Sequence, residues 1–262
     1  MIRALYTAAT GMKGQQFAVD VIANNLANVN TTAFKRSQVQ FRDLLYSTLQ
    51  APGATSSSGQ ILPTGLQIGS GSEIAATSRV GLQGVPEITG RPYDIAVQGE
   101  GFFKVRTQSG ELAYTRNGAF NLDAQGRLVT SEGFLLDPPI TIPPTALNVQ
   151  IAKDGTVSYN LAGQADSQTA GQILLTRFAN TAGLRTEGSN LLYPTGASGQ
   201  PQDSAPGTNG AGMLLQGTLE RSNVEVASEL VNLIIAQRSY EVNSRAIRSS
   251  DEMMQQVNNL AR

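Results

Sequence analysis

The chain contains no cysteine, no histidine and no tryptophan, and the first two absences remove most of the side chains that perform chemistry in proteins. Histidine and cysteine supply the usual metal ligands, thiol nucleophiles and imidazole bases. A Ser-His-Asp triad is therefore excluded, and catalysis would have to rely on carboxylates, lysine, tyrosine or serine. We expect a protein that is not an enzyme and that binds no cofactor and no metal. The missing cysteines exclude disulfides but leave the cellular compartment open.

An excess of charge of one sign is also lacking, because the formal net charge of the 262 residues is -1 and only 15% of them are charged. Nucleic acids and anionic membranes require a basic surface, so we expect neither as a partner. No run approaches the ~20 apolar residues that span a bilayer, which predicts no membrane insertion. The first seventeen residues interrupt their apolar positions with Arg3 and Lys13, so no cleaved signal peptide is predicted. Taken alone, this predicts a cytoplasmic protein, unless an unconventional export route exists.

The opening segment, residues 1–32, has the pattern of a long amphipathic helix. Apolar residues recur at alternating steps of three and four, with Gln15 at the one polar position of the series. The residues of this heptad seam are Leu5, Ala8, Met12, Val19, Ile22, Leu26 and Val29. The pattern predicts a helix whose apolar stripe needs a partner.

The closing segment, residues 217–262, repeats this pattern. Ser222 or Asn223 is the expected N-cap, and Ile234 widens the stripe beyond a two-stranded contact. The seam residues are Val226, Leu230, Leu233, Tyr240, Ile247 and Met254, with polar Gln237, Ser244 and Asp251 between them.

The middle of the chain, residues 79–216, reads as β structure, because glycine and proline separate short alternating runs and leave no room for a long helix. Hairpin turns are expected at Ser109-Gly110, Asn117-Gly118, Asp123–Gly126 and Asp154-Gly155. The Gly99-Glu100-Gly101 segment resembles part of a nucleotide-binding loop, but no third glycine or helix pattern follows, so a β-turn is expected instead.

Residues 33–78 have too little apolar content to fold alone and are expected to form a linker and an extended, hairpin-like arm. The predicted fold class is therefore mixed α and β. It consists of the N- and C-terminal helices and a central all-β domain that carries the arm.

The two apolar stripes leave alternatives open. They can pack against each other within one chain, as an ordinary helix pair on the β body, or neighbouring chains can cover the part that this pairing leaves exposed. The asparagines at positions 24, 25, 28 and 30 either bind backbone groups of adjacent helices or mark a frayed helix end with a C-cap.

Three stretches stand out: ANNLANVNTTAFKR at residues 23–36, DIAVQGEGFFKV at residues 94–105, and the helical run from Gly217 to Ile247. They resemble motifs of the bacterial flagellar rod and hook axial proteins. Because they lie in the first, middle and last parts of the chain, the resemblance extends over the whole chain. Ala33 stands where the first of these motifs usually has glycine, from which we expect no positive φ at this position.

The resemblance also concerns the arm, since residues 43–71 look like a segment that is characteristic of the distal rod branch and absent from hook proteins. Its expected contact residues are Asp43, Leu44, Leu45, Tyr46, Leu62, Pro63, Leu66 and Ile68. Local packing on the chain's own β domain is the alternative for these side chains. The expected subunit-packing residues are Leu5, Met12, Val19, Ile22, Leu26, Val29, Leu230, Leu233, Ile234, Tyr240 and Ile247.

The resemblance implies an axial protein of the flagellar basal body that is exported by the type III apparatus and assembles in the periplasm as a straight, rigid helical tube. The resemblance also implies that the N- and C-terminal helices pair as a coiled coil, which forms an inner domain lining the channel, while the β domain faces outward. The tube would transmit motor torque to the hook through the peptidoglycan and outer-membrane rings. The implied partners are copies of the same chain, proximal rod proteins, the hook protein, the peptidoglycan and outer-membrane ring proteins, and the rod cap. A proximal rod or hook subunit is the nearest alternative. A β-rich protein that binds or processes peptidoglycan carbohydrate is disfavoured by the terminal heptads and the missing tryptophan.

Overall fold

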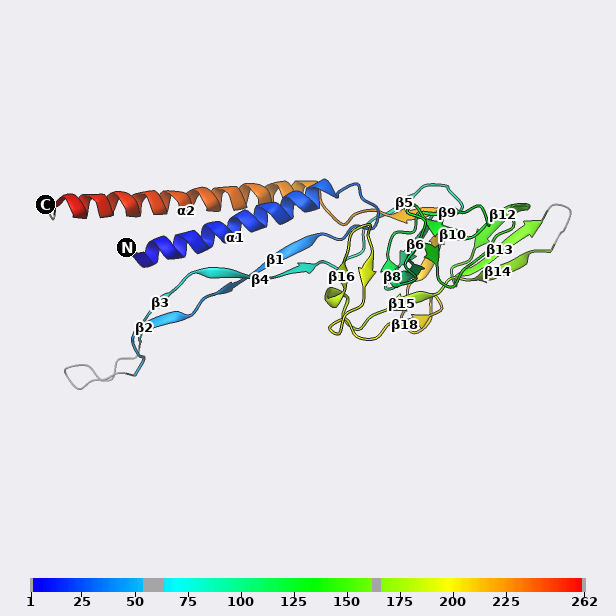
Figure 1. Cartoon of the computed structure of the whole chain (residues 1–262), viewed down its shortest axis with the longest axis horizontal. Helices are drawn as coiled ribbons and strands as arrows, with labels where there is room; N and C mark the ends of the chain where they lie inside the picture. The colour runs from blue at the N-terminus through cyan, green and yellow to red at the C-terminus, as the bar shows by residue number, and fades with distance from the viewer. Residues whose placement is uncertain (1, 54–63, 162–165, 261–262) are drawn as a thin grey trace. The chain divides into compact units, whose positions relative to one another are not determined.

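The computed structural model describes residues 2–53, 64–161 and 166–260. The chain divides into two compact units. The helical unit contains Met1–Ala27, Ser37–Ser78 and Glu225–Arg262, and the β unit contains Asn28–Arg36 and Arg79–Val224. The prediction of two terminal helices that pack together and a central β-rich domain is confirmed (Figure 1).

The helical unit is built on two antiparallel helices that lie side by side, α1 (Ile2–Ala27) and α2 (Val226–Leu260) (Figure 1). Helix α1 ends before the expected residue 32, so Val29 lies in the turn that follows it. Asparagine and threonine are weak helix formers because their side chains compete for backbone hydrogen bonds, and Asn28, Thr31 and Thr32 occupy this turn.

Helix α2 begins at Val226 rather than at residue 217. The predicted N-cap at Ser222 or Asn223 is wrong, since the first helical hydrogen bond runs from Glu229 N–H to Glu225 C=O at 3.0 Å. Strand β20 (Thr218–Glu220) takes up the preceding residues by pairing with β5 (Pro86–Ile88).

An extended two-stranded ribbon completes the helical unit and matches the expected arm. Its strands are β1 (Ser37–Asp43), β2 (Tyr46–Gln50), β3 (Leu66–Gly69) and β4 (Ser72–Arg79), of which β1 pairs with β4 and β2 with β3. Phe41 lies over Gly14 of α1, where an added Cβ would come within 2.9 Å of its ring. The missing side chain of Gly14 therefore lets the ribbon pack on the helix.

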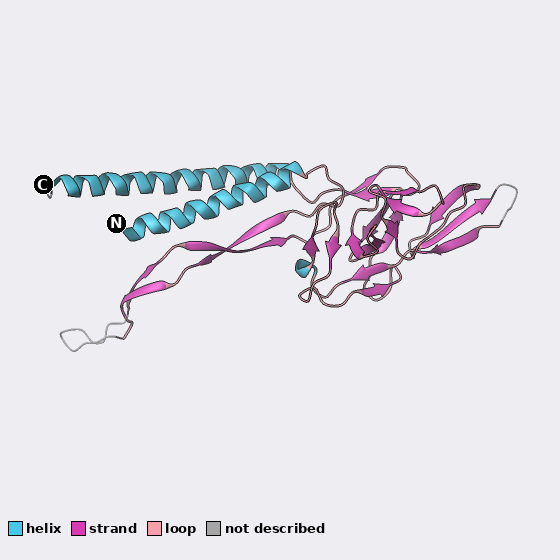
Figure 2. Cartoon of the chain, in the orientation of Figure 1, coloured by secondary structure: helices cyan, strands magenta, loops and turns pink. Residues whose placement is uncertain are grey.

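The β unit contains all the other strands, which are drawn in magenta in Figure 2. They are β6 (Ile95–Gln98), β7 (Phe102–Arg106), β8 (Leu112–Thr115), β9 (Phe120–Leu122), β10 (Leu128–Thr130), β11 (Leu135–Leu136), β12 (Ala146–Ile151), β13 (Thr156–Leu161), β14 (Gln168–Gln172), β15 (Leu175–Arg177), β16 (Arg185–Thr186), β17 (Leu192–Tyr193), β18 (Gln202–Ser204) and β19 (Met213–Gln216), with a short 3-10 helix at Thr181–Gly183.

The largest sheet of the β unit has nine strands, in the order β16-β17-β8-β7-β11-β10-β9, with β15 pairing to β7 and β18. The other described strands of this unit form a three-stranded sheet, β12-β13-β14, and the two-stranded pairs β19-β6 and β20-β5. The core is aliphatic and aromatic, and Phe103 and Phe120 meet edge to face at 5.2 Å between ring centroids.

Three of the four predicted hairpin turns are confirmed: β7-β8, β9-β10 and β12-β13 pair across them. The hairpin at Asn117-Gly118 is wrong, because β8 pairs with β7 and β17 in the described part of the chain. Gly118 C=O instead accepts from Ile95 N–H, and an added Cβ at Gly118 would lie 1.6 Å from the Ile95 carbonyl oxygen. This glycine serves a close backbone approach rather than a turn.

Asn25 joins the end of α1 to the start of the ribbon. Its amide oxygen accepts from Ser37 N–H at 2.9 Å and its amide nitrogen donates to Ser37 C=O at 2.8 Å, as a neighbouring strand would. The same amide donates to the buried carboxylate of Glu229 on α2 at 3.3 Å. The amide therefore binds a strand backbone, which is neither of the two roles expected for the asparagine cluster.

We predict that Asn25→Leu raises the exchange rate of the Ser37 amide hydrogen about thirtyfold, since losing the partner of a partly buried donor costs about 2 kcal/mol. Hydrogen exchange followed by NMR measures this rate. The control is Asn232→Leu, which replaces an exposed asparagine of α2. Equal Ser37 exchange in the two variants would contradict the assignment.

Candidate functional site: the surfaces of the helical unit and the Glu220 network

The helical unit has almost no hydrophobic core within one chain. Among its described residues, the buried apolar side chains are Ala8 and Ala236, and Asn25, Glu229 and Ser250 are buried beside them. A soluble fold normally buries large aliphatic side chains to offset the entropy of ordering its backbone. In this unit the larger apolar side chains among the described residues are at most half-buried, so a single chain leaves it without a fully buried aliphatic core.

Small and polar residues explain how the helices approach each other with so little apolar burial. The face of α2 toward α1 carries Glu229, Ala236, Asn243 and Ser250, at every seventh position. Gly11 of α1 lies against Asn243, where an added Cβ would meet the amide nitrogen at 2.9 Å.

The expected packing residues divide between this interface and the outer surface. Those of α1 are half-buried, as are Val29 in the turn and Leu233 and Ile247 on α2. Leu230, Ile234 and Tyr240 are exposed. The predicted seam of α2 placed Leu230, Gln237, Ser244 and Asp251 one residue after the positions that face α1 in the structure. The signal that could have shown the correct face of α2 is the sevenfold repeat of small and polar residues. This signal is weak, because apolar stripes dominate heptad assignments.

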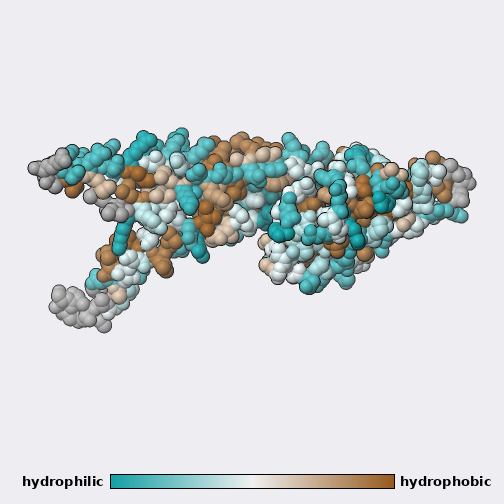
Figure 3. All heavy atoms as spheres, in the orientation of Figure 1, coloured by the Kyte–Doolittle hydropathy of each residue, from teal (hydrophilic) through white to brown (hydrophobic). Residues whose placement is uncertain are grey.

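Because the small and polar face of α2 meets α1, the helix exposes an apolar face near its N-terminal end. Leu230 is 43% exposed, Val231 55%, Ile234 56% and Ile235 58%. Figure 3 shows hydrophobic side chains gathered on the visible surface over this part of α2, with hydrophilic ones toward its C-terminal end. Large contiguous apolar patches on a soluble protein mark sites of association.

The ribbon exposes further apolar side chains at the positions expected for the arm. Leu45, Tyr46, Leu66 and Ile68 are exposed, and Leu45 is the most exposed large hydrophobic side chain of the described residues. Asp43 is also exposed and Leu44 is half-buried. Leu62 and Pro63 lie outside the described residues.

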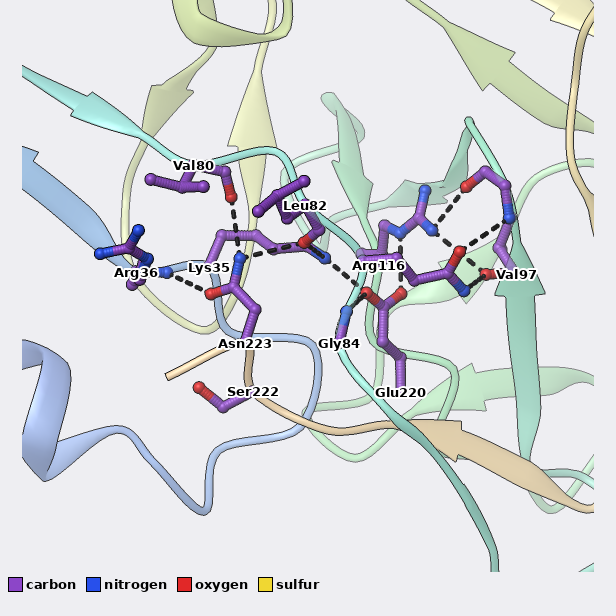
Figure 4. Close-up of polar contacts among 12 residues, drawn as sticks. Lys35, Arg36, Val80, Leu82, Gly84, Val97, Arg116, Glu220, Ser222 and Asn223 are labelled. Carbon is purple, nitrogen blue, oxygen red and sulfur yellow. Dashed lines mark hydrogen bonds and ion pairs between the residues drawn. The ribbon is translucent and has the colours of Figure 1, made fainter. Parts of the chain in front are cut away.

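A buried carboxylate organises the region of the β unit where residues 28–36, 79–84 and 217–224 run together (Figure 4). Glu220 binds Lys35 and accepts from Gly84 N–H at 2.9 Å through Oε1, and its Oε2 accepts from Arg116 Nε at 2.8 Å. Arg116 also donates to the carbonyl oxygens of Gly101, Val97 and Gly99.

Burial alone would raise the pKa of the Glu220 carboxyl. The Arg116 guanidinium, the Lys35 ammonium and the Gly84 N–H outweigh that effect and hold the pKa below its usual value. Burial lowers the pKa of Lys35 in turn, more than its contact with Glu220 raises it.

Asn223 and Ala33 lie next to this network, and each binds backbone groups of the other segments that meet there. Asn223 accepts from Arg36 N–H at 2.7 Å and donates to the carbonyl oxygens of Val80 and Leu82 (Figure 4). Ala33 donates its N–H to Glu220 C=O at 2.7 Å with φ of 59°. The expectation of no positive φ at Ala33 is therefore wrong, and the buried methyl group occupies a left-handed backbone that glycine adopts more easily.

The described residues contain no group of acidic side chains that could hold a metal ion. Within the same ranges, no helix combines the length and apolar character that crossing a membrane requires.

Comparison with known proteins gives three family matches along the chain. Residues 5–35 match the flagella basal body rod protein family, residues 96–159 the D1 domain of flagellar hook protein FlgE/F/G, and residues 215–260 the C-terminal region of flagellar basal body rod FlgEFG proteins. These matches include the Lys35, Arg116 and Glu220 positions of the buried network. They define an axial protein of the flagellum.

Full-length relatives narrow this class. The chain is 48% identical over 260 residues to the flagellar basal-body rod protein FlgG of Caulobacter vibrioides, covering 99% of each protein. It is 45% identical to the protein of the same name in Borreliella burgdorferi, and 40% identical to that in Bacillus subtilis, with 100% of both chains covered in each case. The chain therefore belongs to the family of flagellar basal-body rod proteins.

We predict that Glu220→Gln lowers the free energy of unfolding of the β unit by about 3 kcal/mol, since it leaves Lys35 and Arg116 buried without a counter-charge. Urea unfolding followed by tyrosine fluorescence measures the change, because the chain has no tryptophan.

The pH dependence gives an independent check. Because the pKa of Glu220 is depressed in the folded state, its stabilisation is complete above the ordinary glutamate value of about 4.3 and is lost as pH falls through the lower folded value. Glu220→Gln should remove this part of the loss of folding stability at acid pH. Glu132→Gln, at an exposed turn, should retain it. Identical acid profiles for the two variants would contradict the role of Glu220.

Proposed function

We propose that the chain is a structural subunit of the flagellar distal rod, which assembles with copies of itself into a straight, rigid helical tube. The tube transmits motor torque to the hook through the peptidoglycan and outer-membrane rings. The observation that carries this proposal is the helical unit, whose fully buried apolar residues among those described are alanines and which exposes Leu230, Ile234 and Ile235 of α2. The names of the full-length relatives support the rod within the wider hook and rod class.

The energetics favour many weak contacts over one strong contact. Burying the exposed half of an aliphatic side chain contributes about 1 kcal/mol, so the four on the outward face of α2 contribute about 4 kcal/mol to one contact. Association costs at least that much in lost translational and rotational freedom. A subunit therefore needs several neighbours at once, which is the arrangement in a helical tube.

In this proposal, the paired terminal helices form the inner domain around the channel and the β unit faces outward. The ribbon around residues 43–71 interlocks neighbouring subunits and supplies stiffness. The subunit has no catalytic role and binds no cofactor. It is exported by the type III apparatus without a cleaved signal, assembles in the periplasm beneath the rod cap, and contacts proximal rod proteins, the hook protein and the ring proteins.

We predict that Ile234→Ser combined with Ile235→Ser raises the critical concentration for assembly about tenfold or more, because each change removes apolar area from the outward face of α2. Sedimentation and negative-stain electron microscopy of concentrated protein measure it. The control is Asn232→Ser, at an exposed polar position of the same helix. Unchanged assembly of the double variant would contradict a role for this face of α2 in the contact between subunits.

The arm is tested by deleting residues 46–63. We expect tubes of the deletion variant to be curved or flexible, because the exposed Tyr46 and Leu49 of β2 are lost, while the helical contacts remain. Persistence length measured from micrographs reports the stiffness. Tubes as straight as those of the full chain would contradict a stiffening role for the arm.

A further inference from the structure

The β unit has a cleft of about 630 Å³ that none of the roles above uses. Lys35, Leu82 and Arg116 of Figure 4 line part of it. The other lining residues include Arg79, Phe102, Phe178, Glu100 and Arg177. The rings of Phe102 and Phe178 meet edge to face at 6.0 Å between centroids, so the apolar part of the lining is fixed. Leu82 is 69% exposed beside it.

The cations of this cleft are unequally neutralised. Lys35 and Arg116 share Glu220, and Arg177 binds Glu100 at 2.6 Å. Arg79 is different, because its guanidinium donates to the Leu184 carbonyl oxygen at 3.0 Å and contacts no carboxylate within the described ranges. Burial lowers its pKa with no acidic neighbour to compensate. A half-buried guanidinium with free donors beside aromatic rings suits a carboxylate carried next to an aliphatic side chain.

Within the described residues, the segment from Asp43 to Leu45 has that chemistry. Asp43, at the end of β1, binds no cation among the described residues, and Leu45 two positions later is 89% exposed. Asp43 and Leu45 are both exposed, whereas Leu44 between them is half-buried.

We propose that the cleft receives the Asp43–Leu45 segment of a second copy of the chain, with the carboxylate on Arg79 and Leu45 against Leu82 and Phe102. This inference rests on the proposed assembly and specifies one contact within it. The charged pair sets the register between copies, and the leucine supplies apolar burial.

Disulfide trapping tests the contact directly, because the chain has no cysteine of its own. Full-length chains with Leu45→Cys and with Leu82→Cys, one lengthened by a tag, are mixed, assembled and oxidised. We expect a covalent heterodimer on a non-reducing gel. The matched control replaces Leu82→Cys by Ile88→Cys, an exposed aliphatic position of the β unit outside the cleft lining.

Charge exchange provides a second readout. Asp43→Arg and Arg79→Glu should each raise the critical concentration for assembly about tenfold. The variant that carries both changes should return most of the way to the critical concentration of the unmodified chain. Tubes that form normally without the Leu45–Leu82 heterodimer, or with no recovery in the double variant, overturn this inference and leave the proposed function intact. If the unmodified protein forms no tubes, the proposed function fails and this inference fails with it.

Discussion

The structure depends on one constraint: the helical unit cannot bury its apolar side chains within a single chain. Ala8 and Ala236 are its buried apolar residues among those described, and larger residues such as Ile234 and Ile235 face outward. Close approach of the helices is achieved with Gly11 and with polar contacts such as Asn25 to Glu229. Other copies of the chain therefore have to supply the missing core. The β unit, with Phe103, Phe120 and their aliphatic neighbours fully buried, has no such requirement.

The Glu220 network gives the β unit a fixed arrangement where three chain segments meet. A buried carboxylate with two cations and a backbone N–H is costly to form and more costly to break, so it favours one arrangement over others. Ala33 holds a left-handed backbone in the same place. In a subunit that carries torque, a polar network of this kind would resist sliding of the segments better than apolar contacts, which are not directional.

Hydrophobic periodicity was sufficient to predict both helices and the β-rich middle, because long amphipathic patterns and glycine-punctuated runs are strong local signals. The arm was predicted from the low apolar content of residues 33–78. The helix ends were not predictable, since β20 and the side chain of Asn223 use residues before α2 for contacts distant in sequence. The predicted face of α2 was displaced by one residue from the face that meets α1. The reason is that Glu229 and Ala236 lie at this interface because of close packing and not because of hydrophobicity. Leu45 and Arg79 became a candidate contact only once exposure and ion pairing were known.

The most direct test of the incomplete helical unit is amide hydrogen exchange on dilute and on assembled protein. Exchange along the outer parts of both helices, around Leu5–Val19 of α1 and Tyr240–Val257 of α2, should be fast in the dilute chain and slow in tubes. The β unit should be equally protected in both states. Equal, strong protection of the helices in dilute protein would contradict the account, because the helical unit would then be stable without neighbouring copies.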